Sequence, residues 1–404
     1  MKDYKTHKFR FNLYLEKLYQ SDKPFIIYKV NTGYNIYTDF SEKFVLSEKN
    51  IDKFFKKISN KKYKKETDLY IGFFGYKLLC NLLNLKLKDQ KTKNFYKGIF
   101  YKPETIVKIR NNIKIVSNIK KHKFTRYFSQ TKILSPFKLN INFSKYNKIF
   151  KIFTKKIRQG ETYQIKICTK YKNKSKIDPV NFFWRLMKVN SSPESFLIRD
   201  SDYSVVSCSP ETLIDKKGSN IFTKPIAGTL RKNKNLNKQK ALKYFKNNNK
   251  ETKEHNMIVD MERSDLSKIC KPGTVKISKI KYVEEYKHLY HYVTKIEGSV
   301  KKNIEVKDII IAMMPGGSVI GCPKISTLNL LNLQEKESRN IFTGSFGYIK
   351  FNGDMRFNII IRSILNYKNT SEISVASGVV VDSTARNEFN ENYIKAKSLI
   401  DLYK

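Results

Sequence analysis

Residues 251–266 read ETKEHNMIVDMERSDL, and their spacing predicts the helix around which the chain is organised. In such a helix Glu251 and Glu254 lie one turn apart on one face, and an apolar stripe follows at 257–261. A carboxylate pair at the edge of a buried stripe could hold a hard cation such as Mg²⁺. The same spacing is also found for solvated surface acids.

A second carboxylate pair with the same spacing lies near the C-terminus, in residues 387–395, NEFNENYIK. Glu388 and Glu391 also fall one helical turn apart. If the two helices face each other across one cleft, four carboxylates meet in a single site. If they do not, all four are surface acids, and the sequence between the pairs must decide.

Length and cysteine content limit the class of protein. The chain has 404 residues, enough for one large core or two ordinary ones. No apolar stretch approaches the length that spans a bilayer, and residues 1–8 are polar, so export is not expected. The five cysteines are odd in number and never form a C-x-x-C pair. This argues against a disulfide framework or a zinc site and predicts a reducing, cytoplasmic location.

The formal net charge of +44 first suggests nucleic-acid binding. However, only 12 of the 80 basic residues are arginine, the usual base-reading residue, and the chain has six alanines. An excess of lysine, asparagine and isoleucine over alanine, glycine and arginine is typical of an A/T-rich coding sequence. The lysines are spread through the chain. We therefore expect no nucleic-acid partner, although a basic surface would attract a small dianionic substrate.

Apolar periodicity predicts strands and helices in no strict alternation. Strands are expected at 162–171, 345–350, 357–364 and 373–381, and helices at 146–160, 180–189, 288–296, 304–314, 323–333 and 385–402. We interpret 132–142 as a linker and 230–250 as a surface connector with a helical turn. This order indicates an α+β or complex mixed α/β fold.

From about residue 149 to the end, a series of motifs resembles the chorismate-binding domain of anthranilate synthase component I and aminodeoxychorismate synthase component I. The motifs keep the order of that family: GETYQI (160–165), CSPE (208–211), KPIAGT (224–229), EHNMIVD (254–260), HYVT (291–294), PGGSVIGCPK (315–324), FTGSFGY (342–348), IRS (361–363) and EFNE (388–391). So many motifs in one order are a specific signal. Residues 1–140 resemble the family's N-terminal region only weakly.

The resemblance implies layered antiparallel sheets surrounded by helices, with an N-terminal region at 1–140 and a chorismate-binding catalytic domain at 145–404. It also implies Mg²⁺ as a cofactor. Glu254 and Glu391 match the family's metal ligands, and Glu251 and Glu388 match glutamates that shape the metal's surroundings. Such a set suits Mg²⁺, which takes few protein carboxylates and completes its octahedron with substrate oxygen and water.

Further residues match catalytic or anion-binding positions of the family, and each has a plainer interpretation. Glu211 matches the general acid that protonates the departing 4-hydroxyl; otherwise it caps a turn. Arg362, in an apolar run, and Lys395, one turn after Glu391, match groups that bind substrate carboxylates; otherwise they form structural or surface ion pairs. His291 matches a histidine that lines the site, but a lone histidine is often a satisfied core residue.

The resemblance assigns other positions to contacts with substrate: Gly228, Thr229, Ser318, Phe342, Ala376 and Gly378. Some positions depart from the family's pattern. Phe342 stands where tyrosine or tryptophan is usual, and Ala376 replaces a glycine. Ile320 replaces a small hydroxyl residue and Ser264 an asparagine. Each departure could lower activity.

Two positions, Gln164 and Ala227, separate the branches of the family, which all add a nucleophile to the chorismate ring as the 4-hydroxyl leaves. Isochorismate and salicylate synthases place a lysine base at the position of Gln164, and an amide cannot take up a proton at neutral pH. Many aminodeoxychorismate synthases place a nucleophilic lysine at the position of Ala227, where anthranilate synthases have alanine. Lys224, three residues away in a strand, is expected to point to the opposite face. Ala227 leaves room for ammonia at ring C2, with pyruvate then eliminated, and favours anthranilate synthase component I.

The aminodeoxychorismate branch stays open as an alternative, because 315–324 and 343–348 are more similar to that branch. Residues 190–195 lack the pattern of tryptophan-sensitive anthranilate synthases, so we expect weak feedback inhibition or none. No glutaminase signature surrounds any cysteine. We therefore expect a hetero-oligomer in which a separate glutamine amidotransferase subunit supplies ammonia. A non-catalytic partner of that subunit and a basic nucleic-acid-binding protein are the competing classes.

Overall fold

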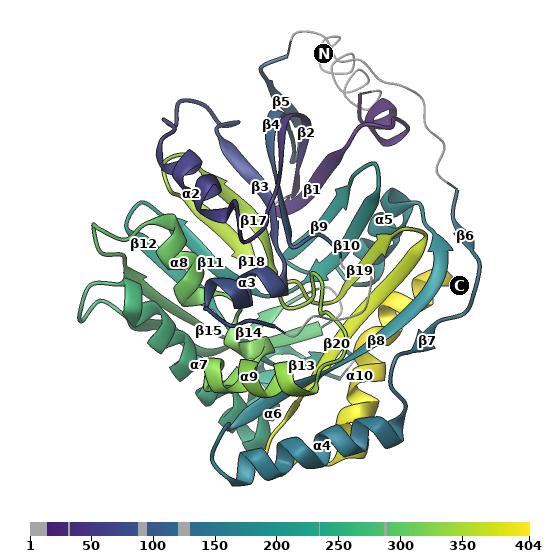
Figure 1. The fold of residues 1–404 in the computed structure, drawn as a ribbon, viewed down its shortest axis with the longest axis vertical. Helices are drawn as coiled ribbons and strands as arrows, with labels where there is room; N and C mark the ends of the chain where they lie inside the picture. The colour runs from purple at the N-terminus through teal and green to yellow at the C-terminus, as the bar shows by residue number, and fades with distance from the viewer. Residues whose placement is uncertain (1–13, 31–32, 88–94, 120–129, 234, 287–288) are drawn as a thin grey trace.

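Two arms of antiparallel strands extend from one long strand pair, β2 (Gly33–Val45) and β4 (Gly98–Ile109), in the computed structural model of the chain (Figure 1). The structure describes residues 14–30, 33–87, 95–119, 130–233, 235–286 and 289–404. The first arm continues from β2 in the order β1 (Phe25–Val30), β9 (Glu194–Arg199), β10 (Tyr203–Ser209), β19 (Ser363–Tyr367), β20 (Thr370–Val379) and β8 (Gln164–Lys176).

The second arm continues from β4. Its order is β3 (Leu69–Phe74), β17 (Ser345–Lys350), β18 (Met355–Asn358), β11 (Thr212–Lys217), β12 (Asn220–Lys224) and β15 (Leu289–Ser299). Strand β15 also pairs with β13 (Ile226–Arg231) and β14 (Lys276–Glu285). Short strands complete the edges: β5 (Ile113–Ser117) on β4, and β6 (Lys132–Ile133), β7 (Lys138–Leu139) and β16 (Gly321–Cys322) on β8.

Aromatic side chains fill the space between the arms. Phe196 of β9 stacks on Phe346 of β17 with ring centroids 3.8 Å apart, and Tyr28 meets Phe346 edge-on. These rings belong to one buried cluster that takes residues from both arms. Because large rings bury much apolar area and prefer defined contacts, this layer fixes how the arms face each other.

Helices cover the outer faces. Helices α2 (Ile51–Ser59), α7 (Asn249–Ile269) and α8 (Val306–Met313) pack on the second arm, and α5 (Pro179–Val189) and α10 (Ala385–Ile400) on the first. Helices α4 (Phe143–Arg158), α9 (Lys324–Gln334) and α3 (Tyr76–Leu82) share a further cluster with β8 and β20. Helix α6 (Lys238–Asn247) lies against α7 and β15 (Figure 1).

The predicted mixed fold with layered antiparallel strands is confirmed. The division into 1–140 and 145–404 stays a prediction. Strands from the two parts nevertheless share hydrogen-bonded pairs, because β1 pairs with β9 and β3 pairs with β17.

Three local predictions need correction. Residues 288–296 were expected to form a helix, but 289–296 belong to β15, whose neighbours on both sides pair with its backbone; residue 288 lies outside the described ranges. The expected strand at 357–364 is divided: β18 ends at Asn358, β19 begins at Ser363, and Arg362 between them has a φ of 52°. The connector at 230–250 contains the whole helix α6 rather than a single turn.

Candidate active site

Helix α7 directs the first carboxylate pair toward the sheet. Its N-cap, Asn248, accepts a hydrogen bond from the backbone N–H of Glu251 at 3.2 Å. Ile258 is buried and packs with Ala227 of β13, which fixes the rotation of the helix. Glu254 then faces β8.

Glu254, one of the predicted metal ligands, contacts two side chains of β8. Its Oε1 accepts a hydrogen bond from Gln164 Nε2 at 2.7 Å and one from Lys166 Nζ at 2.9 Å, both from β8. Burial alone would raise the pKa of Glu254, but the ammonium of Lys166 and the amide of Gln164 hold that pKa at about 2. The carboxylate is therefore ionised at every physiological pH.

The second carboxylate pair lies on α10, which packs along β20. Glu391 forms an ion pair with Lys395 at 2.6 Å, and Lys395 also donates to the backbone oxygen of Ala376 at 2.9 Å. Glu388 is only 1% exposed and accepts a hydrogen bond from Ser383 Oγ at 2.9 Å. Both roles of Lys395 considered above remain open, since the ion pair with Glu391 does not exclude a contact with substrate.

The two pairs share one neighbourhood. Burial and the negative charge of Glu254 raise the pKa of Glu391, whereas the nearby Lys395 and Lys166 lower it. The net effect is a lowered pKa. Lys166 is within the influence of Glu254, Glu391 and Glu388 together. Within the described ranges, no three His, Cys, Asp or Glu side chains lie close enough to hold a metal ion by themselves. A four-glutamate metal site stays a prediction.

Glu211 stands where β10 ends and β11 begins, and its side chain is buried. Ser318 Oγ donates to its Oε1 at 2.8 Å. Burial raises the pKa of Glu211 to about 7, against the lowering effect of the Ser318 hydrogen bond. A carboxyl with this pKa is part protonated near neutral pH, as a general acid requires. The turn-capping interpretation stays open as well, because a hydrogen bond with the backbone of Ile226 also acts on the carboxyl.

Arg362 and His291 bring unsatisfied nitrogen atoms to the same region. Arg362 adopts a left-handed conformation, and its NH1 has no hydrogen-bond partner among the described residues. The same holds for Nε2 of His291, whose Nδ1 lies 3.0 Å from Thr229 Oγ1. Burial lowers the pKa of His291 to about 3, and the charge of Arg362 adds to this effect, so the imidazole is neutral. Arg362 and Glu211 also interact electrostatically, since the charge of Glu211 opposes the lowering of the Arg362 pKa by burial.

Strand β13 carries three predicted site residues next to α7. The pairing of β13 with β15 has a bulge between Ala227 and Thr229, and Gly228 within it has a φ of 79°. A Cβ on Gly228 would lie 2.8 Å from Glu251 Oε2, so only glycine fits without movement. Lys224 forms an ion pair with Glu284, whose cross-strand partner is His291, so the expectation that Lys224 points away from the site stays a prediction.

The remaining predicted contacts lie on β20 and near β17. A Cβ on Gly378 would lie 2.6 Å from Lys166 Nζ and 2.7 Å from Gln164 Nε2, so this glycine leaves space for both side chains. Phe342 is buried, with its ring 5.9 Å from the Arg339 guanidinium. Its contact with substrate stays a prediction.

Sequence reasoning missed Lys166. The residue follows Gln164 by two positions on β8, and alternate side chains of a strand point to the same face. That periodicity would have been sufficient to place its ammonium beside Gln164.

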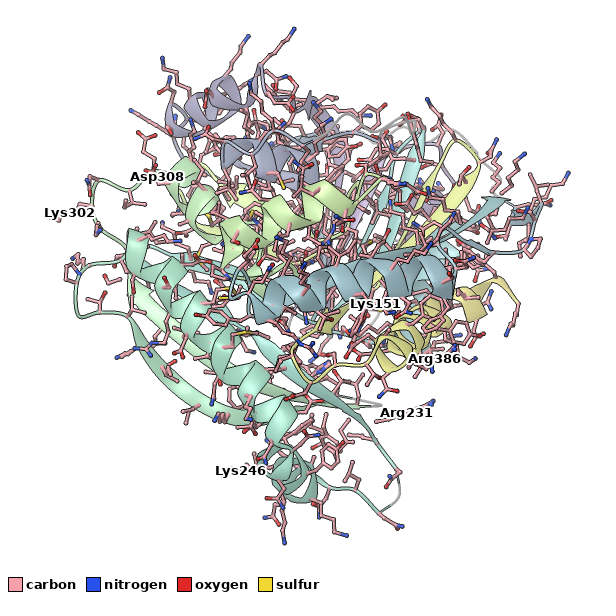
Figure 2. The ribbon with its side chains drawn as sticks, turned by 60° about the horizontal axis from the view of Figure 1, so that its bottom comes forward. Lys151, Arg231, Lys246, Lys302, Asp308 and Arg386 are labelled. Carbon is pink, nitrogen blue, oxygen red and sulfur yellow. The ribbon has the colours of Figure 1, made fainter. Side chains whose placement is uncertain are left out.

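Other basic side chains lie outside this region and are distributed around the molecule. Lys151, Lys246, Lys302 and Arg386 project from separate elements (Figure 2), and all four are exposed. The positive charge is therefore a general property of the surface rather than one patch. None of the helices in the described ranges is long and apolar enough to cross a membrane.

Comparison with known proteins identifies the family. The family model described as chorismate binding enzyme matches residues 13–401. The chain belongs to the chorismate-binding enzyme family. The resemblance inferred from the motifs is thus confirmed. An "anthranilate synthase component I-like protein" from Synechocystis is 30% identical over 347 residues, which cover 82% of this chain and 72% of that protein.

Other relatives carry the names of both branches. The aminodeoxychorismate synthase component 1 of Bacillus subtilis is 33% identical over 59% of this chain, and an anthranilate synthase component 1 of Haloarcula marismortui is 34% identical over 61%. The matches span about half the length of these two relatives, 51% and 50%. The specific member of the family is therefore not decided by identity.

Solved structures share the fold. Anthranilate synthase component I from Streptococcus pneumoniae TIGR4 aligns with a TM-score of 0.76 at 24% identity, over 94% of this chain and 91% of that chain. The menaquinone-specific isochorismate synthase from Escherichia coli aligns with the same TM-score of 0.76 at 15% identity, over 96% and 91%.

Proposed function

We propose that this protein is an anthranilate synthase component I, which aminates chorismate with ammonia and eliminates pyruvate to give anthranilate. The buried acid Glu211, fixed by Ser318 and electrostatically linked to Arg362, supports the ring chemistry that both branches of the family share. The observation that carries the choice of anthranilate is Ala227, which leaves no amine at its position. Departure of a ring hydroxyl needs a proton donor, and removal of an acid from water is what keeps a carboxyl protonated near pH 7.

Glu211 would protonate the departing 4-hydroxyl, with Ser318 orienting its carboxyl. The unpaired NH1 of Arg362 would bind a substrate carboxylate, because a buried guanidinium without a partner is completed by an anion. The neutral His291 would offer Nε2 to a polar group of the substrate. Contacts of Gly228, Thr229 and Phe342 with substrate belong to the same proposal.

The donor groups fit Mg²⁺ as the cofactor. Glu254 and Glu391 are ionised oxygen ligands whose charges act on each other, and the buried Oε1 of Gln164 has no hydrogen-bond partner among the described residues. Glu254 and Glu391 would hold the ion, with Glu251 and Glu388 around it. When bound, Mg²⁺ would neutralise the ring carboxylate and stabilise charge developing on the ring.

Two side chains support ammonia rather than water or a protein amine as the nucleophile. Gln164 has an amide where a base is needed to activate water, and its Nε2 is engaged by Glu254. Ala227 is buried beside Ile258 and Met261, and its methyl group leaves no amine at that position. Lys224 is engaged by Glu284. Free ammonia from a separate amidotransferase subunit would then attack the ring, in a cytoplasmic hetero-oligomer.

Aminodeoxychorismate synthase component I is the second candidate. The relative from Bacillus subtilis that bears this name favours it. Both candidates share the Glu211 step and differ in the position aminated and in the loss of pyruvate.

The product distinguishes the candidates. We would incubate the purified chain with chorismate, Mg²⁺ and ammonium at alkaline pH and identify products by mass spectrometry and pyruvate release. Anthranilate with stoichiometric pyruvate supports the proposal, and aminodeoxychorismate without pyruvate selects the second candidate. No turnover, with the amidotransferase still bound, indicates a non-catalytic partner. Salt-sensitive binding to duplex DNA without chorismate chemistry selects the nucleic-acid class.

A further inference from the structure

Lys166 occupies the centre of the glutamate cluster. Its Nζ donates to Glu254 Oε1 at 2.9 Å, and the residue is only 9% exposed. The side chain reaches this place because Gly378, on the neighbouring strand β20, has no Cβ to meet its tip. The ammonium is therefore built into the site rather than drawn from the surface.

The contact uses the same atom that a metal would need. Glu254 Oε1 already accepts hydrogen bonds from Gln164 and Lys166. The ammonium also lies within the electrostatic influence of Glu391 and Glu388. A second cation at these carboxylates would be repelled by the ammonium at close range.

We propose that Lys166 is a resident counter-cation that holds the glutamates together without metal and that Mg²⁺ must displace from Glu254. The inference rests on the proposed assignment of Glu254 as a metal ligand, and it extends that assignment to regulation of the site. Mg²⁺ affinity is then set by competition between a fixed internal cation and the free ion. Without metal, the ammonium offsets part of the negative charge of the glutamates.

The test measures metal binding without chorismate. Mn²⁺, a paramagnetic substitute for Mg²⁺, is titrated into the full chain and free Mn²⁺ is followed by electron paramagnetic resonance. Lys166→Met keeps the length of the side chain and removes its charge, and we expect it to bind Mn²⁺ at least tenfold more tightly than the unmodified protein. Lys172→Met is the matched control, because Lys172 lies on the same strand and pairs with Glu337 at 2.5 Å outside the site. Its affinity should stay within twofold.

A second variant locates the metal. Glu254→Gln in the Lys166→Met background should abolish the tight binding. Equal or weaker binding by Lys166→Met, absence of binding in every variant, or tight binding that survives Glu254→Gln would each overturn the inference.

The unmodified protein gives an independent measurement if Lys166→Met does not fold. Release from Glu254 should expose the amine, so Mg²⁺ should increase the rate of acetylation of Lys166 at least fivefold, as read by peptide mass spectrometry, with Lys172 as the internal reference. An unchanged or lower rate overturns the inference. Neither measurement uses turnover. A protein that does not aminate chorismate would therefore contradict the proposed function, but it would not affect the test of competition between Lys166 and the metal.

Discussion

Two half-buried arginines, Arg356 and Arg362, lie six residues apart and have opposite surroundings. Arg356 forms ion pairs with Glu194, at 2.5 Å, and with Asp215. Glu194 is fully buried and also accepts hydrogen bonds from Tyr28 and from Thr212. Every charge in this cluster has a partner, and Arg356 lowers the pKa of Glu194 against the opposing effect of burial.

Among the described residues NH1 of Arg362 has no hydrogen-bond partner, and the acid in its region, Glu211, has a pKa raised by burial rather than lowered by an ion pair. Unsatisfied buried polar atoms cost free energy, and folding alone does not explain why they are kept. The paired cluster therefore contributes to the stability of the sheet, whereas the unpaired nitrogen of Arg362 marks a candidate ligand site.

The largest expected effect follows from replacing the buried acid Glu211. Glu211→Gln keeps the shape of the side chain and its contact with Ser318 but removes the transferable proton. General acids typically contribute about 10²- to 10⁴-fold, so kcat for chorismate should fall about a thousandfold, roughly 4 kcal/mol, while the free energy of unfolding at about pH 4, where the carboxyl is protonated in both states, stays nearly unchanged. Steady-state kinetics and denaturant unfolding check both. A kcat within tenfold of the unmodified protein would remove Glu211 from the chemistry.

The paired cluster should respond through stability instead. Arg356→Met leaves Glu194 and Asp215 without their counter-ion, and breaking a buried pair in this way costs about 3–4 kcal/mol of unfolding free energy. Urea denaturation measures the loss. Near-normal stability would show that Glu194 finds another partner, and the contrast between the clusters would weaken.

The raised pKa of Glu211 should make stability depend on pH. Because the folded pKa is about 7 and the ordinary value is 4.5, the folded state binds the proton more strongly. The stabilising contribution is fully present below about pH 4.5 and is lost as pH rises through about 7, a change of about 3 kcal/mol. When unfolding free energies are measured from pH 4 to pH 8, that of the unmodified protein should therefore fall relative to that of Glu211→Gln as the pH rises. Parallel curves would contradict it. At a fixed concentration of free ammonia, kcat/KM should also fall above about pH 7.

The smallest effect is expected for the unpaired arginine. Arg362→Met should raise KM for chorismate about thirtyfold, roughly 2 kcal/mol, because a hydrogen bond to a charged group is lost. Its unfolding free energy should stay the same or increase, since a buried unpaired group is removed. Isothermal calorimetry with chorismate and urea denaturation separate the two quantities. A stability loss as large as that of Arg356→Met would make Arg362 structural.

Helix α7 shows what the sequence could predict. The spacing of Glu251, Glu254 and the apolar stripe predicted the helix and its faces, because apolar residues that recur about every 3.6 positions can be recognised over a long segment. The order of the motifs placed Glu211 and Arg362 in one family pattern. These inferences rest on local periodicity or on similarity, and neither needs the paths of distant strands.

The rest depends on contacts between distant segments. No local signal shows that the run IIIRS breaks at Arg362, since its left-handed backbone is imposed by neighbours such as Cys208, whose N–H bonds to the Arg362 carbonyl at 3.2 Å. The segment 289–296, predicted as a helix, is a strand because it pairs with β13 on one side and β14 on the other, and its local sequence does not reveal those pairings. The ammonium of Lys166 also needed the position of α7 to be recognised.

The pairing of Leu69–Phe74 with Ser345–Lys350 has a consequence for synthesis. A ribosome must translate nearly the whole message before β3 meets β17, and until then the backbone groups along that edge are open to other chains. Distant pairings of this kind slow folding and expose a nascent protein to aggregation. The yield of functional protein in a cell should therefore depend on chaperones that cover β3 until its late partner emerges.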